Sequence, residues 1–291
     1  MVKPKTGSGR RSILSVPASD GQKIGKALRA GADEVVLDLE DAVAPSDKDR
    51  AREVLAAFPW QDFEALPLLT VRVNAPRTSW CHRDVEAVAR GRVPASSIVL
   101  PKVESRADVG FVERLLDGVE PAGSDPLAVQ ALVETARGLA RLDDVVDDIE
   151  RLSSLILGYA DLAASLGRGA GFSADAWLVA QERVLVAARS AGLEAVDGPH
   201  LEVQVDDAFW TAAERAVALG FDAKWAIHPG QVPALNAAFR PPAEEVAHAQ
   251  AVLRVLEDGH RVGRGAVQLD GALVDEAMAV HARRVLAKAR A

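Results

Sequence analysis

Two carboxylate residues follow short apolar runs near the middle of the chain. Glu134 comes directly after the run 127–133, and Asp161 follows the run 154–158. Runs of this length suit strands that are buried on both faces, as in a parallel sheet. Because the carboxyl ends of parallel strands meet at one edge of a sheet, both acids are predicted to project from the same rim. Two oxygen ligands with positions left for water and substrate are the arrangement that Mg²⁺ prefers.

A simpler role for these two acids stays open on this pattern. Each could instead cap the helix that follows its strand, since aspartate and other short polar residues commonly occupy such positions. The pattern around the two acids does not choose between capping and metal binding.

Other polar residues follow the remaining predicted strands, and a barrel would bring them to the same rim as the two acids. Arg72 has a planar fork that matches a carboxylate, so it is predicted to bind a small oxyacid. Its alternative partner is Asp38 or Glu40, and we expect these two acids to orient neighbouring groups rather than bind a metal directly. Lys102 is expected to pair with an acid, and His228 to be structural.

The elements that must position these residues follow a regular alternation. Eight short strands are predicted, separated by helical segments, at 12–16, 34–39, 69–74, 97–102, 127–133, 154–158, 194–198 and 224–229. This count over roughly 230 residues predicts an α/β protein with a (β/α)₈ TIM barrel. An open doubly wound sheet is the alternative, but the glycine-rich turn that normally follows its first strand is missing.

The chain divides into three parts on this prediction. Residues 1–10 are expected to be a flexible leader, 11–240 the TIM barrel, and 241–291 a C-terminal helical extension or lid. Helices are predicted near 243–258 and 275–289, on either side of Gly263-Arg264-Gly265. Their apolar positions recur at helical spacing and must be buried against the barrel or against a neighbouring subunit.

Composition limits the classes of function. The chain has 291 residues, 49% of them hydrophobic, and a formal net charge of −8, which argues against a general nucleic-acid-binding protein. A single cysteine, Cys81, leaves no intramolecular disulfide and no cysteine-based zinc site. No apolar run is long enough to span a bilayer, so we expect a cytoplasmic protein without a membrane partner.

Several segments, in order along the chain, carry a family resemblance. They are 11–17 (RSILSVP), 31–43 (GADEVVLDLEDAV), 71–74 (VRVN), 100–105 (LPKVES), 131–138 (ALVETARG), 160–162 (ADL) and 226–232 (AIHPGQV). Together they resemble the CitE-like (citrate lyase beta subunit-like) proteins of the HpcH/HpaI aldolase and citrate lyase superfamily. The resemblance implies a TIM barrel, Mg²⁺ held by Glu134 and Asp161, and binding of the substrate by Arg72, which takes its oxyacid part, and by Glu134. It also implies a CoA or acyl-carrier thioester as the other half of the substrate, and assembly into homotrimers or hexamers.

The chain departs from this pattern at two places. Many relatives have an acid where Ala160 stands, so the hydrogen bonds beside Asp161 are expected to differ. A glycine commonly follows the proline that ends the first strand, whereas Ala18 follows Pro17 here. That difference could reshape the side that binds the thioester.

The segment 265–275 resembles the C-terminal lid of the malyl-CoA and citramalyl-CoA lyase group. In those relatives an aspartate matching Asp275 handles the proton, often in the active site of the adjacent subunit. Its alternative role here is to cap the last helix, and both roles could hold. Glu276-Ala277-Met278 follows it, where the relatives usually have a proline-containing stretch.

The implied function is a Mg²⁺-dependent carbon–carbon lyase. It would cleave a 3-hydroxyacyl-CoA of the malyl, citramalyl or citryl type into an acyl-CoA and a small 2-oxo acid, with Arg72 and Asp275 as catalytic residues. The alternatives are a malate-synthase-like condensing enzyme or a thioester hydrolase on the same site, and a non-catalytic CitE-like binding protein. Arg11, Lys23 and Lys26 are candidates for binding the CoA phosphates, with solvated surface charge as their alternative role.

Overall fold

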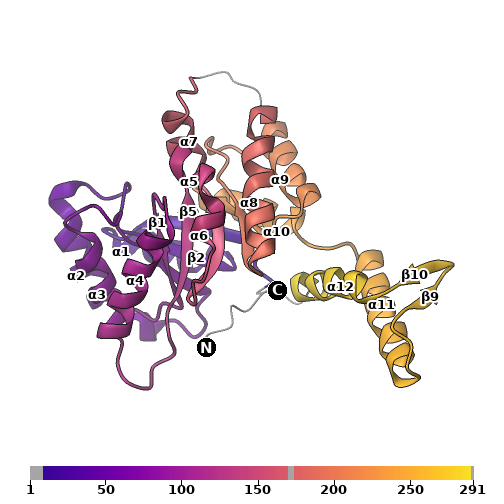
Figure 1. The fold of residues 1–291 in the computed structure, drawn as a ribbon. Helices are drawn as coiled ribbons and strands as arrows, with labels where there is room; N and C mark the ends of the chain where they lie inside the picture. The colour runs from indigo at the N-terminus through magenta and orange to yellow at the C-terminus, as the bar shows by residue number, and fades with distance from the viewer. Residues whose placement is uncertain (1–8, 170–173, 290–291) are drawn as a thin grey trace.

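The barrel predicted from the alternating elements is present in the computed structural model, which describes residues 9–169 and 174–289. Eight parallel strands pair in chain order, and β8 returns to pair with β1. They are β1 (Ser12–Pro17), β2 (Glu34–Asp38), β3 (Leu68–Arg72), β4 (Ser97–Leu100), β5 (Ala128–Val133), β6 (Leu152–Leu157), β7 (Glu194–Asp197) and β8 (Ala223–Ala226). Helices surround these strands (Figure 1). The predicted TIM barrel is therefore confirmed.

The helices of the barrel follow its successive strands. They are α1 (Gly21–Leu28), α2 (Lys48–Ala57), α3 (Cys81–Ala89), α4 (Arg106–Val119), α5 (Ala136–Ala140), α6 (Leu142–Val145), α7 (Tyr159–Ser165), α8 (Leu178–Ser190), α9 (Asp207–Leu219) and α10 (Val232–Ala238). Local signals set their ends: α9 begins after Asp206, whose side chain accepts a hydrogen bond from Phe209 N at 2.9 Å, and ends at Gly220 with a φ of 96°. Within the two described ranges, no helix combines the length and the apolar character needed to cross a membrane.

Side chains fill the inside of the barrel in layers. The middle layer is apolar and consists of Ile13, Val36, Val99, Leu132, Ile156, Val196, Ala223 and Trp225. Outward-facing side chains of the same strands join a larger apolar cluster beneath the helices. Because both faces of each strand are buried, the strands have nearly continuous apolar sequences. This packed layer supports the polar groups at the carboxyl ends of the strands.

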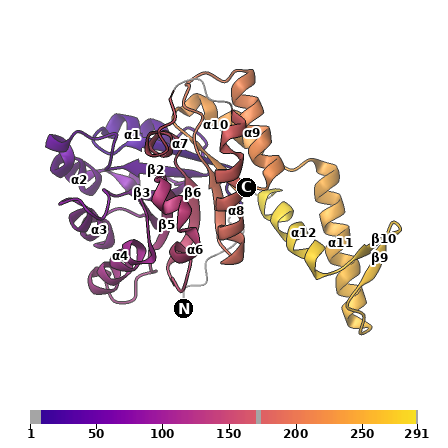
Figure 2. The ribbon, with the colours of Figure 1, turned by 45° about the horizontal axis from the view of Figure 1, so that its top comes forward.

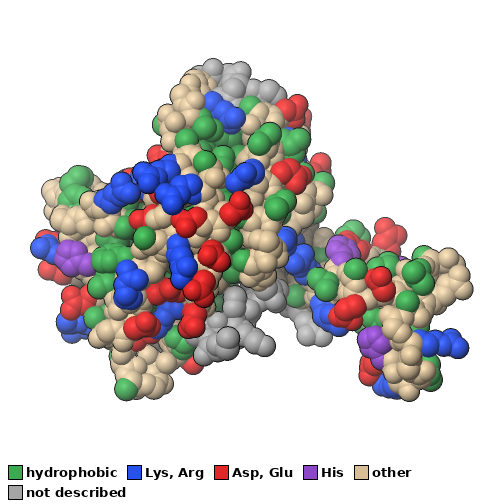
Figure 3. All heavy atoms as spheres, in the orientation of Figure 1, with side chains coloured by type: hydrophobic (Ala, Val, Ile, Leu, Met, Phe, Trp, Pro, Cys, Tyr) green, Lys and Arg blue, Asp and Glu red, His purple; other side chains and the backbone are tan. Residues whose placement is uncertain are grey.

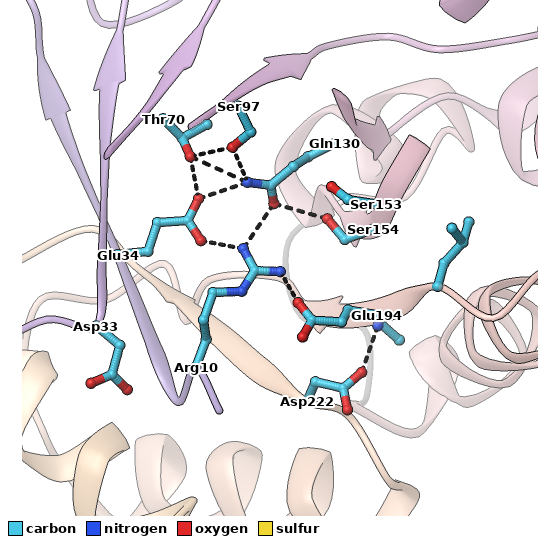
Figure 4. Close-up of polar contacts among 12 residues, drawn as sticks. Arg10, Asp33, Glu34, Thr70, Ser97, Gln130, Ser153, Ser154, Glu194 and Asp222 are labelled. Carbon is cyan, nitrogen blue, oxygen red and sulfur yellow. Dashed lines mark hydrogen bonds and ion pairs between the residues drawn. The ribbon is translucent and has the colours of Figure 1, made fainter. Parts of the chain in front are cut away.

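A polar layer closes the opposite end of the barrel, around Arg10 (Figure 4). The Arg10 guanidinium forms buried ion pairs with Glu34 and Glu194 and donates a hydrogen bond to Gln130 Oε1 at 3.1 Å. Gln130 in turn donates to Glu34 at 2.7 Å. The predicted leader, residues 1–10, therefore extends too far, because Arg10 belongs to the barrel. Residues 1–8 lie outside the described ranges, whereas Gly9 and Arg10 are buried in the barrel.

The C-terminal extension consists of α11 (Ala243–Arg261), a hairpin of β9 (Val267–Leu269) and β10 (Ala272–Val274), and α12 (Glu276–Ala289). Its own apolar cluster includes Ala249, Val252, Val274, Ala282 and Val285. The two views in Figures 1 and 2 show most of the extension directed away from the barrel, and Figure 3 shows the same separation with all atoms drawn. Contact is made near the end of α12, where Lys288 Nζ donates to Phe221 O at 3.0 Å. The two helices were predicted, but the hairpin was not.

Candidate active site

A pocket of about 380 Å³ lies at the carboxyl ends of the strands. In TIM-barrel enzymes this is the end at which active sites are found. Its polar lining includes Asp38, Arg72, Glu134 and Asp161, and its apolar lining includes Leu132, Leu157, Ala160, Leu201, Trp225 and Ile227. The layered barrel therefore brings both predicted metal ligands and the predicted oxyacid-binding arginine to one cavity. It also places Ala160, where many relatives have an acid, on the wall.

Glu134 directly follows β5 and is almost completely buried. One of its oxygens, Oε1, accepts a hydrogen bond from Lys102 N at 2.9 Å. Burial raises the pKa of Glu134 to about 8, and the neighbouring Glu40 carboxylate acts in the same direction. The backbone of Gly158 passes so close that an added Cβ would lie 2.7 Å from Glu134 Oε2. A divalent cation at this carboxylate would offset the cost of burying its charge.

Asp161 lies in the first turn of α7, and its side chain is 38% exposed. Its Oδ2 atom is 3.2 Å from Lys102 Nζ. The open alternative, that both acids only cap helices, is wrong in this structure. Thr135 caps α5 by accepting a hydrogen bond from Gly138 N, and the N-cap position of α7 is Gly158.

Arg72 ends β3 and is held by Asp38. Its Nε donates to Asp38 Oδ1 at 2.8 Å, and its Nη2 donates to Asp38 Oδ2 at 2.5 Å. Nη1 lies 3.3 Å from Glu40 Oε2. Burial alone would lower the pKa of Arg72, but the Asp38 and Glu40 carboxylates outweigh it and raise the pKa above its ordinary value. Asp38, the predicted alternative partner, thus occupies one edge of the guanidinium. Arg72 still lines the pocket.

Lys102 connects the acids of this rim. Its ammonium donates a hydrogen bond to Glu40 and lies 3.4 Å from Asp41 Oδ2, in addition to its contact with Asp161. The expectation that Lys102 pairs with acids agrees with these contacts. Glu40 Oε2 is buried and has no hydrogen-bond partner among the described residues, although the Arg72 charge is near.

Lys48 and Asn74 hold the loop after β2 in place. The sequence predicted no role for either residue. The Lys48 ammonium is buried and donates to the backbone oxygens of Leu39 and Glu40, both at 2.7 Å. Asn74 Nδ2 donates to Leu39 O at 3.0 Å. Burial lowers the pKa of Lys48, and the surrounding acids, Asp38 first, act against it. Nothing in the sequence near Lys48 signals this contact, because it depends on how α2 packs against the loop.

A second buried cluster supports the segment that carries Asp161. Tyr159 Oη donates to Asp197, which also forms an ion pair with Lys224 near the start of β8. Burial raises the pKa of Tyr159, and the Asp197 charge adds to the effect. Asp197 is therefore buried in this cluster and does not line the pocket. Tyr159 is the member of this cluster that lines the pocket.

Three other candidate residues lie outside the pocket. Arg11 precedes β1, at the opposite end of the strand, and both its backbone and its guanidinium are bound by Asp33 at 2.8–2.9 Å. Its prediction as a CoA-binding residue is therefore wrong, because a partly buried ion pair with Asp33 occupies it at the end of the barrel opposite the pocket. His228 caps the turn η4 (Pro229–Gln231), as expected of a structural histidine. Asp275 caps α12 through Ala277 N at 3.0 Å and does not line the pocket of its own chain.

The donor set fits Mg²⁺. Among the described residues, no three His, Cys, Asp or Glu side chains are grouped closely enough to hold a metal ion by themselves. Glu134 and Asp161 would supply two oxygen ligands, which leaves the remaining positions to water and substrate, as is usual for Mg²⁺. The buried carboxylate of Glu40 adds negative charge beside these two ligands.

Comparisons with known proteins agree with this geometry. The family model described as HpcH/HpaI aldolase/citrate lyase matches residues 11–229. The chain is 33% identical to an L-malyl-CoA/beta-methylmalyl-CoA lyase of Cereibacter sphaeroides, across 98% of this chain and 96% of the relative. It is 34% identical to a (3S)-malyl-CoA thioesterase of the same species, across 97% and 95%.

Solved structures show the same similarity. The CitE protein of Mycobacterium tuberculosis, in complex with magnesium, acetoacetate and coenzyme A, superposes with a TM-score of 0.73. It is 33% identical, and the match covers 97% of this chain and 98% of that one. A citrate lyase beta subunit from M. tuberculosis, complexed with oxaloacetate and magnesium, gives a TM-score of 0.68 at 33% identity and covers 80% of this chain and 97% of that one.

Proposed function

Because the chain belongs to the HpcH/HpaI aldolase/citrate lyase family, we propose that it is a Mg²⁺-dependent carbon–carbon lyase. It cleaves a 3-hydroxyacyl-CoA of the malyl, citramalyl or citryl type into an acyl-CoA and a small 2-oxo acid. The observation that carries this proposal is the meeting of Glu134, Asp161 and Arg72 in one pocket at the catalytic end of the barrel. Relatives named as malyl-CoA lyases, and CitE structures holding magnesium with acetoacetate or oxaloacetate, support it.

The residues of the pocket have separate roles in this reaction. Glu134 and Asp161 hold the cation, which when bound acts as a Lewis acid and orients the oxygens of the oxo acid. Arg72 binds the carboxylate of the oxo acid through the N–H groups that Asp38 does not use, since Asp38 occupies only one edge of the guanidinium. Asp38 thereby fixes the orientation of Arg72 before the substrate arrives.

The thioester binds beside this pocket, in a groove that shares Pro17 and Ala42 with it. Lys23, Arg50 and Phe58 also line this groove. Lys23 is therefore the better placed of the two remaining CoA candidates, because Lys26 is exposed further along α1 and does not line the groove. Two basic side chains and an aromatic ring suit the phosphates and the adenine of CoA.

The extension completes the site from a neighbouring subunit. Asp275 does not reach the pocket of its own chain, and the extension is directed away from the barrel (Figure 2). We therefore propose a homotrimer or hexamer in which Asp275 serves as the general acid or base over the pocket of the adjacent subunit. A location in the cytoplasm stays a prediction from the sequence.

Product analysis tests the proposed reaction. With (3S)-malyl-CoA and Mg²⁺, we expect acetyl-CoA and glyoxylate in equal amounts and no free CoA. Free CoA together with malate would instead support the thioesterase alternative, which the 34% identical relative keeps open. Absence of any turnover with malyl-, citramalyl- and citryl-CoA would support a non-catalytic binding protein and would contradict the lyase proposal.

Arg72→Lys is expected to weaken binding of oxaloacetate or glyoxylate by on the order of 1.5–3 kcal/mol for each charge-assisted hydrogen bond that the substitution removes. A lysine ammonium cannot hold Asp38 and an oxyacid along two edges as a guanidinium can. Calorimetric titration with the oxo acid in the presence of Mg²⁺ measures the decrease in affinity. Arg52→Lys is the matched control, since Arg52 is similarly buried and pairs with Asp84 outside the pocket. Equal affinities for the wild-type and Arg72→Lys proteins would exclude Arg72 as the oxyacid-binding residue.

A further inference from the structure

Lys102 contacts both proposed metal ligands through different parts of the same residue. Its backbone N–H donates to Glu134 Oε1 at 2.9 Å, and its side-chain Nζ lies 3.2 Å from Asp161 Oδ2. The backbone adopts a φ of 54°, which is uncommon for a residue other than glycine. In this conformation Lys102 directs both its backbone amide and its ammonium at acids of the proposed metal site.

The Lys102 ammonium lies in a negatively charged part of the site. Four carboxylates of the rim lie near it: Glu40, Asp41, Glu134 and Asp161. Two neighbouring cations are engaged elsewhere: Arg72 pairs with Asp38 and lies near Glu40, and Lys48 donates to the backbone oxygens of Leu39 and Glu40. Lys102 is the described cation whose ammonium contacts Asp161, one of the two proposed metal ligands, and it offsets part of the negative charge of this rim.

We propose that binding of Mg²⁺ to this site is a cation exchange with Lys102. The ammonium occupies the rim of the metal-free protein and gives up Asp161 when the divalent cation enters, while its hydrogen bond to Glu40 keeps it in the site. Two reasons support the exchange. Asp161 is needed by both cations, and a positive side chain this close repels a divalent ion. This inference rests on the proposed metal site, and it adds Lys102 as a residue that determines the affinity of the site for Mg²⁺.

Metal titration of the substrate-free protein tests the exchange. Lys102→Met removes the charge but keeps an unbranched side chain of similar length, so the uncommon backbone conformation costs about the same in both proteins. We expect Lys102→Met to bind Mg²⁺ at least about tenfold more tightly than the wild type in calorimetry. Lys102→Arg, which keeps the charge, should not gain affinity. Lys288→Met is the control for loss of one positive charge, because Lys288 contacts Phe221 O away from the pocket.

Thermal unfolding supplies a second measurement. Without metal, Lys102→Met should melt below the wild type, because the acids of the rim lose their compensating charge. With saturating Mg²⁺ the difference in melting temperature should shrink or reverse. If Lys102 weakens Mg²⁺ binding, bound Mg²⁺ must in turn reduce the stabilisation that Lys102 provides, because such coupling is reciprocal. Lys102→Gln provides the same test if the methionine variant does not fold.

The possible outcomes separate the exchange from the metal site itself. Mg²⁺ binding by the wild type, with unchanged or weaker binding by Lys102→Met, would overturn the exchange and leave the metal site standing. A gain in affinity for Lys102→Arg equal to that for Lys102→Met would also overturn it, because the charge would then not be the cause. Failure of the wild type to bind Mg²⁺ would overturn the metal site and the exchange together.

Discussion

Glu134→Gln and Asp161→Asn are each expected to lose Mg²⁺ binding and with it the cleavage of the thioester substrate. The protein supplies only two carboxylate ligands in the proposed arrangement, so each removal takes away half of them. Changes to residues that merely support a metal ligand typically cost about 10–100-fold in affinity, and loss of a ligand should cost at least the upper end of that range. Calorimetric titration of the substrate-free proteins with Mg²⁺ measures the effect.

Glu104→Gln is the matched control for this titration. Glu104 lies on the loop after β4, where it pairs with Arg77 and Arg137 at 3.6 and 3.9 Å, and it does not line the pocket. Its variant should bind Mg²⁺ as the wild type does. If Glu134→Gln and Asp161→Asn matched the control, the metal ion would have to lie elsewhere.

Asp275→Asn is expected to lower the rate of cleavage by about 10²–10⁴-fold, the usual contribution of a general acid or base. Asparagine is as good an N-cap as aspartate, so α12 should keep its start and the protein its stability. The variant therefore separates the chemical role of Asp275 from its capping of Ala277 N. Steady-state kinetics and thermal unfolding are measured together. Asp270→Asn, in the hairpin of the same extension, is the control and should keep full activity.

Mixing two inactive variants tests whether Asp275 acts in a neighbouring subunit. Subunits of Asp275→Asn carry an intact metal site, and subunits of Glu134→Gln carry an intact Asp275. Hybrid oligomers formed by subunit exchange should regain part of the activity, because some pockets then have both groups. With exchange demonstrated independently by mass spectrometry, no recovery would mean that Asp275 acts on its own pocket or only caps α12.

The parts of the fold that follow from local sequence pattern could be predicted. The strands of a closed parallel barrel are buried on both faces, so each appears as a short apolar run, and eight runs indicate the barrel. The same rule brings Glu134, Asp161 and Arg72 together, since Arg72 ends β3, Glu134 directly follows β5, and Asp161 lies in the first turn of the helix after β6. Position on the strand was enough to predict this part of the site.

Features that depend on long-range packing could not be predicted. Arg10 looks like part of a polar leader, yet it meets Glu34 and Glu194 because the barrel brings three distant segments together. Arg11 was predicted to bind CoA from its charge alone, and its partner Asp33 becomes visible only when β1 and β2 are paired. The positive φ of Lys102 has no sequence signal, because such residues are usually glycine or asparagine. The hairpin 267–274 was missed because its strands have three residues each.

A crystal grown with Mn²⁺ in place of Mg²⁺ and with oxaloacetate provides the most direct test of a two-carboxylate metal site in this barrel. Mn²⁺ binds the same hard oxygen ligands and has a measurable anomalous signal. We expect one strong anomalous peak within bonding distance of the Glu134 and Asp161 carboxylates, with oxaloacetate beside it and the oxaloacetate carboxylate bound by Arg72. A peak held by other side chains, or oxaloacetate bound without a metal ion, would contradict this expectation.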